Sequence, residues 1–188
     1  MAAIRYQKSL QHVFAAVPLS QVVLVFLGST LIVIGTKINI PVQPVPVTLQ
    51  SFAVVFLGMI CGFRISLLCV FVYCVAGLME LPVFIGDLKL NAGYLIGFFL
   101  AAGLTGFLAE CGWSRHIFSA MTTALLGSMM ILLCGWLVLT YSLGAIAAFN
   151  VGVKPFLLIE ALKVIFLALV IPCFWWFEVG WADKPNTE

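Results

Sequence analysis

Two charged residues stand inside a long apolar segment near the C-terminus of the sequence. Glu160 and Lys163 belong to the stretch KPFLLIEALK, residues 154–163, which opens an apolar segment that continues to Phe177. Residues three positions apart project from one face of a helix. A charge at the centre of a membrane span costs about 2.5–3.5 kcal/mol on insertion scales, and such charges usually mark a ligand or ion path. The pair therefore indicates either the polar floor of a ligand site or a mutual ion pair that locks helices together.

Other hydrogen-bonding residues stand at the starts of further apolar segments. Thr48 and Gln50 follow a proline-rich stretch, Asn91 and Tyr94 open another segment, and Tyr73 lies within a third. A mostly apolar pocket with a few placed polar groups suits a small molecule, and these side chains supply neutral donors, acceptors and flat apolar area. The simpler readings are an interfacial position for Tyr94 and a helix-to-helix hydrogen bond for Gln50.

Several classes of enzyme and pump are excluded by residues that the sequence lacks. No lysine stands in a G-x-x-x-x-G-K-[ST] context, so the chain has no P-loop for ATP. Asp87 and Asp183 fall in an expected loop and tail, which excludes an intramembrane aspartyl dyad, and no serine–histidine pair suits an intramembrane protease. Neither the six cysteines nor His12 and His116 form a metal-ligand pattern. We therefore expect no enzyme, no metal and no cofactor.

Composition identifies the solvent in which these residues must be positioned. Of the 188 residues 64% are hydrophobic and 9% are charged, and the mean hydropathy is +1.22. Soluble domains are about half apolar and a quarter charged. The net charge of +2 offers no basic face for nucleic acid. The sequence predicts an all-α polytopic protein surrounded by membrane lipids, with one integral membrane domain over residues 1–188 and short polar tails at about 1–12 and 178–188.

Charged residues and prolines divide the chain into six predicted transmembrane helices. About 20 residues cross the hydrocarbon core of a bilayer, and only helices satisfy their backbone groups within such a span. Prolines 41, 44 and 46 forbid a regular helix after the first span and predict an ordered loop or a re-entrant element. The expected spans are Phe14–Gly35, Val47–Gly62, Ile65–Met79, Asn91–Ala109, Ile117–Ser142 (with a looser end through Asn150) and Pro155–Phe177.

An even number of spans places both termini on one side of the membrane. Positive residues mark the cytoplasmic side, and the side of the termini carries five of them against three on the other. The first group is Arg5, Lys8, Arg64, Arg115 and Lys184, and the second is Lys37, Lys89 and Lys154. We expect cytoplasmic termini. The candidate polar residues then follow the loops of the opposite, extracytoplasmic side, where the ligand site is expected.

Four segments give the sequence a family resemblance. IPVQPVPVTLQ at residues 40–50 resembles the first-loop signature of the BioY family, the biotin-specific substrate-binding (S) components of energy-coupling factor (ECF) transporters. Three later parts of the chain are similar to family segments in order and spacing: YCVAG at 73–77 followed by LPVF at 81–84, GYLIGF at 93–98, and KPF at 154–156. The second of these makes Gly93 a candidate substrate-binding residue. The similarity covers most of the chain, from about residue 25 to 170.

The resemblance implies a six-helix protein of the cytoplasmic membrane whose outer half binds biotin beneath the first loop. It also implies a transmembrane coupling subunit and two ATP-binding-cassette ATPases as partners, although some family members are thought to work without them. Our hypothesis is that Glu160 accepts a hydrogen bond from a ureido N–H of biotin, and that Asn91 or Gln50 completes the bonds of that ring. Lys163 is expected to be the ion partner of Glu160, and the alternative is a counter-ion for the biotin carboxylate.

The chain departs from the family pattern near the site, and other functions stay open. Glu160 replaces the usual aspartate, Leu90-Asn91-Ala92 replaces Pro-Thr-Gly, and Glu80 replaces a glycine. One alternative is a transporter or S component for another small vitamin, which ligand competition would separate from biotin. Another is a membrane scaffold with a purely structural Glu160–Lys163 pair, which no ligand would stabilise.

Overall fold

The first elements follow from the apolar run after residue 17 and from the prolines behind it. The computed structural model describes residues 18–41, 45–79, 81–85 and 88–182. Helix α2 (Pro18–Lys37) begins at a proline. Proline has no backbone N–H, but an N–H in the first turn of a helix has no partner within the helix, so no hydrogen bond is lost. Strands β1 (Asn39–Ile40) and β2 (Val47–Thr48) then form an antiparallel hairpin. The flanks of the predicted proline loop are therefore ordered, whereas residues 42–44 lie outside the described residues. The predicted start of the second span at Val47 is wrong, because Val47 lies in β2.

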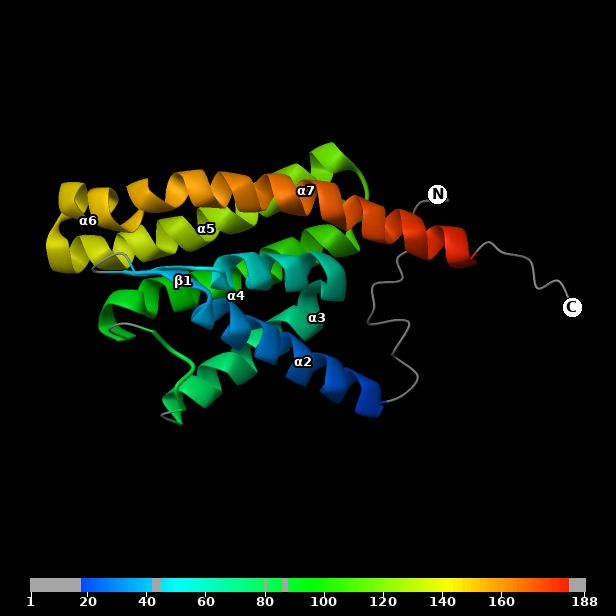
Figure 1. Ribbon diagram of the computed structural model, residues 1–188, viewed down its shortest axis with the longest axis horizontal. Coiled ribbons are helices and arrows are strands. Elements are labelled where there is room, and N and C mark those ends of the chain that lie inside the picture. The colour runs from blue at the N-terminus through cyan, green and yellow to red at the C-terminus, as the bar shows by residue number, and fades with distance from the viewer. Residues whose placement is uncertain (1–17, 42–44, 80, 86–87, 183–188) are drawn as a thin grey trace, which may run out of the picture.

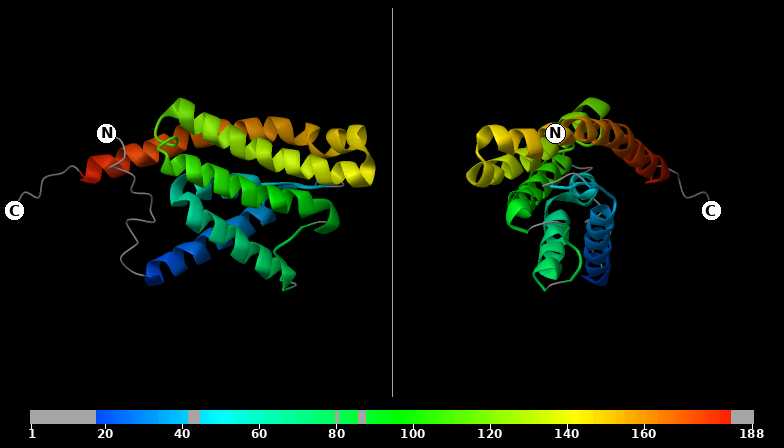
Figure 2. Two further views of the ribbon diagram at one scale, coloured as in Figure 1. Left: turned by 180° about the vertical axis from the view of Figure 1, so that it is seen from behind. Right: turned by 60° about the vertical axis from the view of Figure 1, so that its left-hand side comes forward.

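Helix α3 (Gln50–Leu78) contains both of the short spans that were predicted on either side of Arg64. Gly62 interrupts the helix with φ 78° and ψ −177°, a backbone conformation that is essentially restricted to glycine. Just after the break, the backbone N–H of Phe63 donates a hydrogen bond of 2.8 Å to Glu110 Oε1, which satisfies a donor at the start of the second arm. Figures 1 and 2 show the chain turning back sharply at this point, so α3 has two arms.

Helices α4 (Leu88–Glu110), α5 (Ile117–Leu143) and α7 (Lys154–Ala182) correspond to the remaining predicted spans. Helix α5 does not continue to Asn150 as the looser prediction allowed. Gly144 ends it with φ 81°, and a separate short helix, α6 (Ala145–Gly152), follows. Helix α7 continues beyond Phe177, so the first part of the predicted C-terminal tail is helical. The N-terminal tail, residues 14–17 of the first predicted span and residues 183–188 lie outside the described residues.

Within the described residues, five helices are long and apolar enough to cross a membrane. They are α2, α3, α4, α5 and α7. Large apolar side chains cover their outer faces: Phe26, Phe118 and Trp176 are 68%, 81% and 78% exposed. Such faces are stable in lipid rather than in water. The chain is therefore an all-α, multi-pass membrane protein, and the predicted count of six spans corresponds to counting the two arms of α3 separately.

The helix bundle has two distinct ends, which Figures 1 and 2 show on opposite sides of the molecule. The hairpin end holds the end of α2, the β-hairpin, α6 and the starts of α4 and α7. The kink end holds the start of α2, the break at Gly62 and the connection between α4 and α5. Lys37, Lys89 and Lys154 thus belong to the hairpin end, and Arg64 and Arg115 belong to the kink end.

Close packing at glycines joins the middle helices into one core. Helix α4 packs against both α3 and α5. A Cβ atom at Gly97 would lie 2.8 Å from the Cα of Ile131, and one at Gly106 would lie 2.6 Å from the Cα of Phe63. Distances below 3 Å leave no room for a side chain, so these positions let the helix backbones touch. These contacts pack α3, α4 and α5 closely together.

Candidate ligand-binding site

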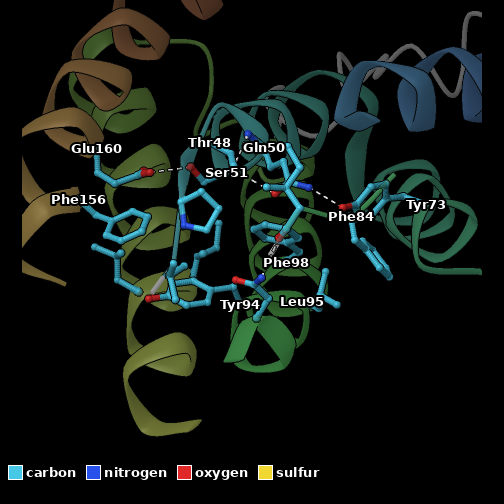
Figure 3. A pocket seen from close by; sticks show the side chains of 16 residues that line it. Thr48, Gln50, Ser51, Tyr73, Phe84, Tyr94, Leu95, Phe98, Phe156 and Glu160 are labelled. Atoms are coloured by element: carbon cyan, nitrogen blue, oxygen red, sulfur yellow. Dashed lines mark hydrogen bonds between the residues drawn. The ribbon is translucent and has the colours of Figure 1, made fainter. Parts of the chain in front are cut away.

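A pocket lies among the starts of α3, α4 and α7 and the inner face of α5, close to the hairpin end. About 610 Å³ of unfilled space lies between its walls and at its mouth, open solvent included. Figure 3 shows the side chains that converge on it from these elements. The residues that line it are Val45, Pro46, Thr48, Gln50, Ser51, Tyr73, Phe84, Ile85, Asn91, Tyr94, Leu95, Phe98, Ile131, Leu132, Phe156 and Glu160.

Glu160 and Lys163 form an ion pair at the wall of the pocket. Lys163 Nζ lies 2.7 Å from Glu160 Oε1, and each residue is 6% exposed. Ser51 Oγ donates a hydrogen bond of 2.6 Å to the same carboxylate oxygen and accepts one of 2.8 Å from Lys163. A third bond of 2.8 Å runs from Lys163 to the backbone carbonyl of Thr48. The ammonium group therefore uses all three of its N–H donors on protein acceptors. The predicted ion pair between Glu160 and Lys163 is confirmed.

Gln50 is held by a second network that joins α2 and both arms of α3. Its Nε2 donates hydrogen bonds to Thr36 Oγ1 and Tyr73 Oη, and its Oε1 accepts one of 3.0 Å from Thr48 Oγ1. Tyr73 in turn donates to the carbonyl oxygen of Val83. Both N–H donors of the Gln50 amide are thereby engaged within the protein. Gln50 lines the pocket, but its side chain mainly joins helix segments by hydrogen bonds. This is the simpler of the two interpretations given for Gln50 above.

The two polar residues from α4 have different hydrogen-bonding states. Tyr94 is 7% exposed, and its hydroxyl donates a hydrogen bond of 2.7 Å to the backbone carbonyl of Gly152 in α6. The interfacial position that was considered for Tyr94 is therefore wrong. Asn91 Nδ2 donates one hydrogen bond of 2.9 Å to the carbonyl of Ile85. The second N–H and the amide oxygen of Asn91 are left available to a ligand.

The side-chain groups that have no partner in the pocket wall are few. Glu160 Oε2 is buried and makes no hydrogen bond. Buried polar atoms without a partner are uncommon, and each one needs an explanation. Asn91 adds its amide oxygen and one N–H to this group. The described lining side chains therefore offer two acceptors, Glu160 Oε2 and Asn91 Oδ1, and one N–H donor. The hydroxyl hydrogens of Thr48, Ser51 and Tyr73 are already used within the protein.

The rest of the pocket is apolar and strongly aromatic. The Tyr94 and Phe156 rings stack with centroids 5.8 Å apart, and Tyr73 meets the Phe84 ring edge-on with centroids 5.3 Å apart. Phe98 adds a further ring to the wall, as Figure 3 shows. Aromatic walls with a few fixed polar groups suit a small, flat, largely apolar ligand with a polar head.

Six of the eight predicted site residues line the pocket. They are Thr48, Gln50, Tyr73, Asn91, Tyr94 and Glu160. Lys163 lies behind Glu160, and Gly93 packs against α5, where a Cβ atom would lie 2.6 Å from the carbonyl oxygen of Cys134. Sequence reasoning missed Ser51, which bridges both members of the ion pair. The only signal was its position next to Gln50 at the start of an apolar segment.

The fold is that of a multi-pass membrane protein with a pocket among its helices. The model of the BioY family matches residues 7–178, and the chain belongs to this family. It is 37% identical over 151 residues to the biotin transporter BioY of Thermotoga maritima, covering 76% of this chain and 88% of that protein. It is 33% identical over 150 residues to the probable biotin transporter BioY of Pyrococcus horikoshii, with the same two shares covered.

A solved structure has the same fold. It is the crystal structure of the S-component for biotin from an ECF-type ABC transporter, and it matches with a TM-score of 0.72 over 83% of this chain and 90% of that one. The two chains are 20% identical, so this likeness supports the arrangement of the helices.

Proposed function

We propose that the protein binds biotin in this pocket and serves as the substrate-specific component for its uptake. Family membership and the two biotin transporters described above support this substrate. The observation that carries the proposal is Glu160 Oε2, a buried oxygen without a partner on a residue that lines the pocket. The ureido ring of biotin presents two N–H donors and one carbonyl acceptor. Among the described lining residues, the free side-chain groups are two acceptors and one donor, which is the complementary set.

Glu160 is the group that contributes most to this recognition. Hydrogen bonds to a charged acceptor are shorter and stronger than those between neutral groups. Ser51 and Lys163 hold the other carboxylate oxygen, so Oε2 is fixed in position before the ligand arrives. Asn91 supplies the second acceptor and the remaining N–H. The aromatic rings of Tyr94, Phe98 and Phe156 cover the fused rings of biotin, whose sulfur and carbon atoms are apolar.

The proposal includes a place in the cytoplasmic membrane, with the pocket in its outer half. Six spans result if each arm of α3 crosses the bilayer, and the opposite courses of the two arms support this count. The excess of positive residues on the side of the termini favours a cytoplasmic kink end. The hairpin end then faces outward, where a vitamin arrives.

Energy for uptake is proposed to come from partner subunits. The sequence has no P-loop for ATP. A transmembrane coupling subunit and two ATP-binding-cassette ATPases are the partners that family membership favours, and the likeness to an S-component supports that division of labour.

Calorimetric titration of the purified chain in detergent tests the substrate. We expect saturable biotin binding with one ligand per chain and a nanomolar to low micromolar Kd, weaker binding of dethiobiotin, and none of an unrelated vitamin. Dethiobiotin retains the ureido ring but lacks the sulfur-containing ring, so it buries less apolar area. A folded chain that does not bind biotin but is stabilised by another vitamin would contradict the proposed substrate. A chain that no ligand stabilises would be a scaffold.

A glycine behind Tyr94 offers a test of the pocket shape. A Cβ atom at Gly135 would overlap the ring of Tyr94. The ring must then move, and overpacking of this kind costs about 1–3 kcal/mol. Gly135→Ala is expected to lower biotin affinity by about tenfold or more, in proportion to that cost. The measurement is the same titration.

Gly103→Ala is the matched control for this variant. It adds the same methyl group to α4, where the nearest atom is Phe63 Cε2 at 3.3 Å, and Gly103 does not line the pocket. Its biotin affinity is expected to match that of the unchanged chain. Equal affinities for Gly135→Ala and the unchanged chain would show that the Tyr94 ring does not shape the bound state.

A further inference from the structure

Among the described residues, Lys163 is the basic group that contacts the pocket lining, and it is already fully engaged. Lys163 donates to Thr48 O, Ser51 Oγ and Glu160 Oε1, and an ammonium group has three N–H donors. It does not line the pocket. The single charged residue in the lining is an acid, Glu160. Among the described residues, the pocket wall therefore contains no cation that could pair with an anionic ligand group.

Uncharged side-chain donors do not replace the missing cation. A carboxylate is an acceptor-only group and needs N–H or O–H donors around it. Among the described lining side chains only one N–H of Asn91 is left, because the hydroxyl groups and the Gln50 amide donate to protein acceptors. A carboxylate placed inside would also lie close to the buried Glu160 oxygen that has no partner, and two nearby like charges in a dry site repel strongly.

The described lysines of the hairpin end offer only weak and screened attraction to an anion. Lys37 donates a hydrogen bond of 2.6 Å to the carbonyl oxygen of Pro82. Lys89 and Lys154, at the starts of α4 and α7, are exposed to the surroundings. Exposed charges pair weakly and are screened by salt.

We infer that the pocket recognises only the neutral head of its ligand and leaves the ligand's carboxyl group outside. The substrates would then form a wider class than free biotin, namely biotin derivatives whose carboxyl is an amide or an ester. Such compounds keep the ureido N–H groups that donate hydrogen bonds to Glu160 and Asn91. They lose only a charge for which the described pocket wall has no partner. This inference rests on the proposed function, because it assumes that biotin occupies this pocket.

Four ligands titrated into the purified chain in detergent test the inference. They are biotin, biotinamide, biotin methyl ester, and biotin with a methoxycarbonyl group on a ureido nitrogen. Biotinamide and the methyl ester are expected to bind within about fivefold of biotin, because no ion pair is lost. The ureido-blocked compound is expected to bind at least about 100-fold more weakly, since it loses a charge-assisted hydrogen bond and adds bulk at the head.

The outcomes separate this inference from the proposed function. Tight binding of biotin with a 100-fold loss for both neutral derivatives would overturn the inference and leave the proposed function standing. An absence of biotin binding by the folded chain would overturn the proposed function, and the inference with it. Lys163→Met provides a second test: it should change the affinities for biotin and biotinamide by the same factor. A selective loss of biotin would identify Lys163 as the counter-ion of the carboxylate.

Discussion

Replacing Lys163 by methionine is expected to destabilise the protein by about 3–5 kcal/mol, the usual cost of removing one partner of a buried ion pair. Glu160 and Lys163 are each 6% exposed and lie 2.7 Å apart, so the change leaves a buried carboxylate without its cation. Two further hydrogen bonds, to Thr48 O and Ser51 Oγ, are lost with the ammonium group. Thermal unfolding of the detergent-solubilised chain measures the effect.

Two control variants show whether charge, rather than packing, causes the loss. Lys154→Met removes an exposed lysine at the start of the same helix and should change stability by less than about 0.5 kcal/mol. The double variant Glu160→Gln, Lys163→Met removes both charges, so it should be more stable than Lys163→Met alone. If Lys163→Met unfolds at the same temperature as the unchanged chain, the pair does not hold α7 to α3.

Glu160→Gln is expected to weaken biotin binding by about 10- to 100-fold. A hydrogen bond to a charged group contributes about 1.5–3 kcal/mol, and each 1.4 kcal/mol is a factor of ten in affinity. Glutamine keeps the size of the side chain and can still accept one hydrogen bond, so the change acts mainly on charge. Calorimetric titration gives the affinity, and the unfolding temperature of the variant confirms that it is folded.

Glu110→Gln is the matched control, because it makes the same substitution at the other end of the bundle. Glu110 accepts a hydrogen bond from Phe63 N–H beside the α3 break and does not line the pocket. Its variant should bind biotin with unchanged affinity, even if the break is less stable. Equal affinities for Glu160→Gln and the unchanged chain would remove Glu160 from the proposed site.

The helical fold was largely predictable because long apolar runs and the charges between them directly reflect the bilayer. Arg64 correctly marked a boundary inside α3, but it did not reveal that the break is a single glycine at Gly62. The hairpin of β1 and β2 was not predicted, because the prolines predicted a loop and the pairing of Asn39 with Thr48 depends on tertiary structure.

Site residues could be predicted where their residue type is rare in membrane spans. They could not be predicted where the residue type is common there. Glu160 and Lys163 were conspicuous because charges are costly in a span. Ser51 was not, since serine is common in membrane helices and only its contacts with both charged groups reveal its role. Gln50 was identified as polar, but its engagement by Thr36 and Tyr73 depends on how distant segments pack.

The structure of the biotin complex tests the central claim most directly. The claim is that Glu160 Oε2, which has no partner within the protein, accepts a ureido N–H of biotin. The account predicts a ureido nitrogen about 2.7–2.9 Å from that oxygen, the usual length of a charge-assisted bond, with the carboxyl group at the mouth. Biotin bound with its carboxylate toward Lys163, or outside the pocket altogether, would contradict it.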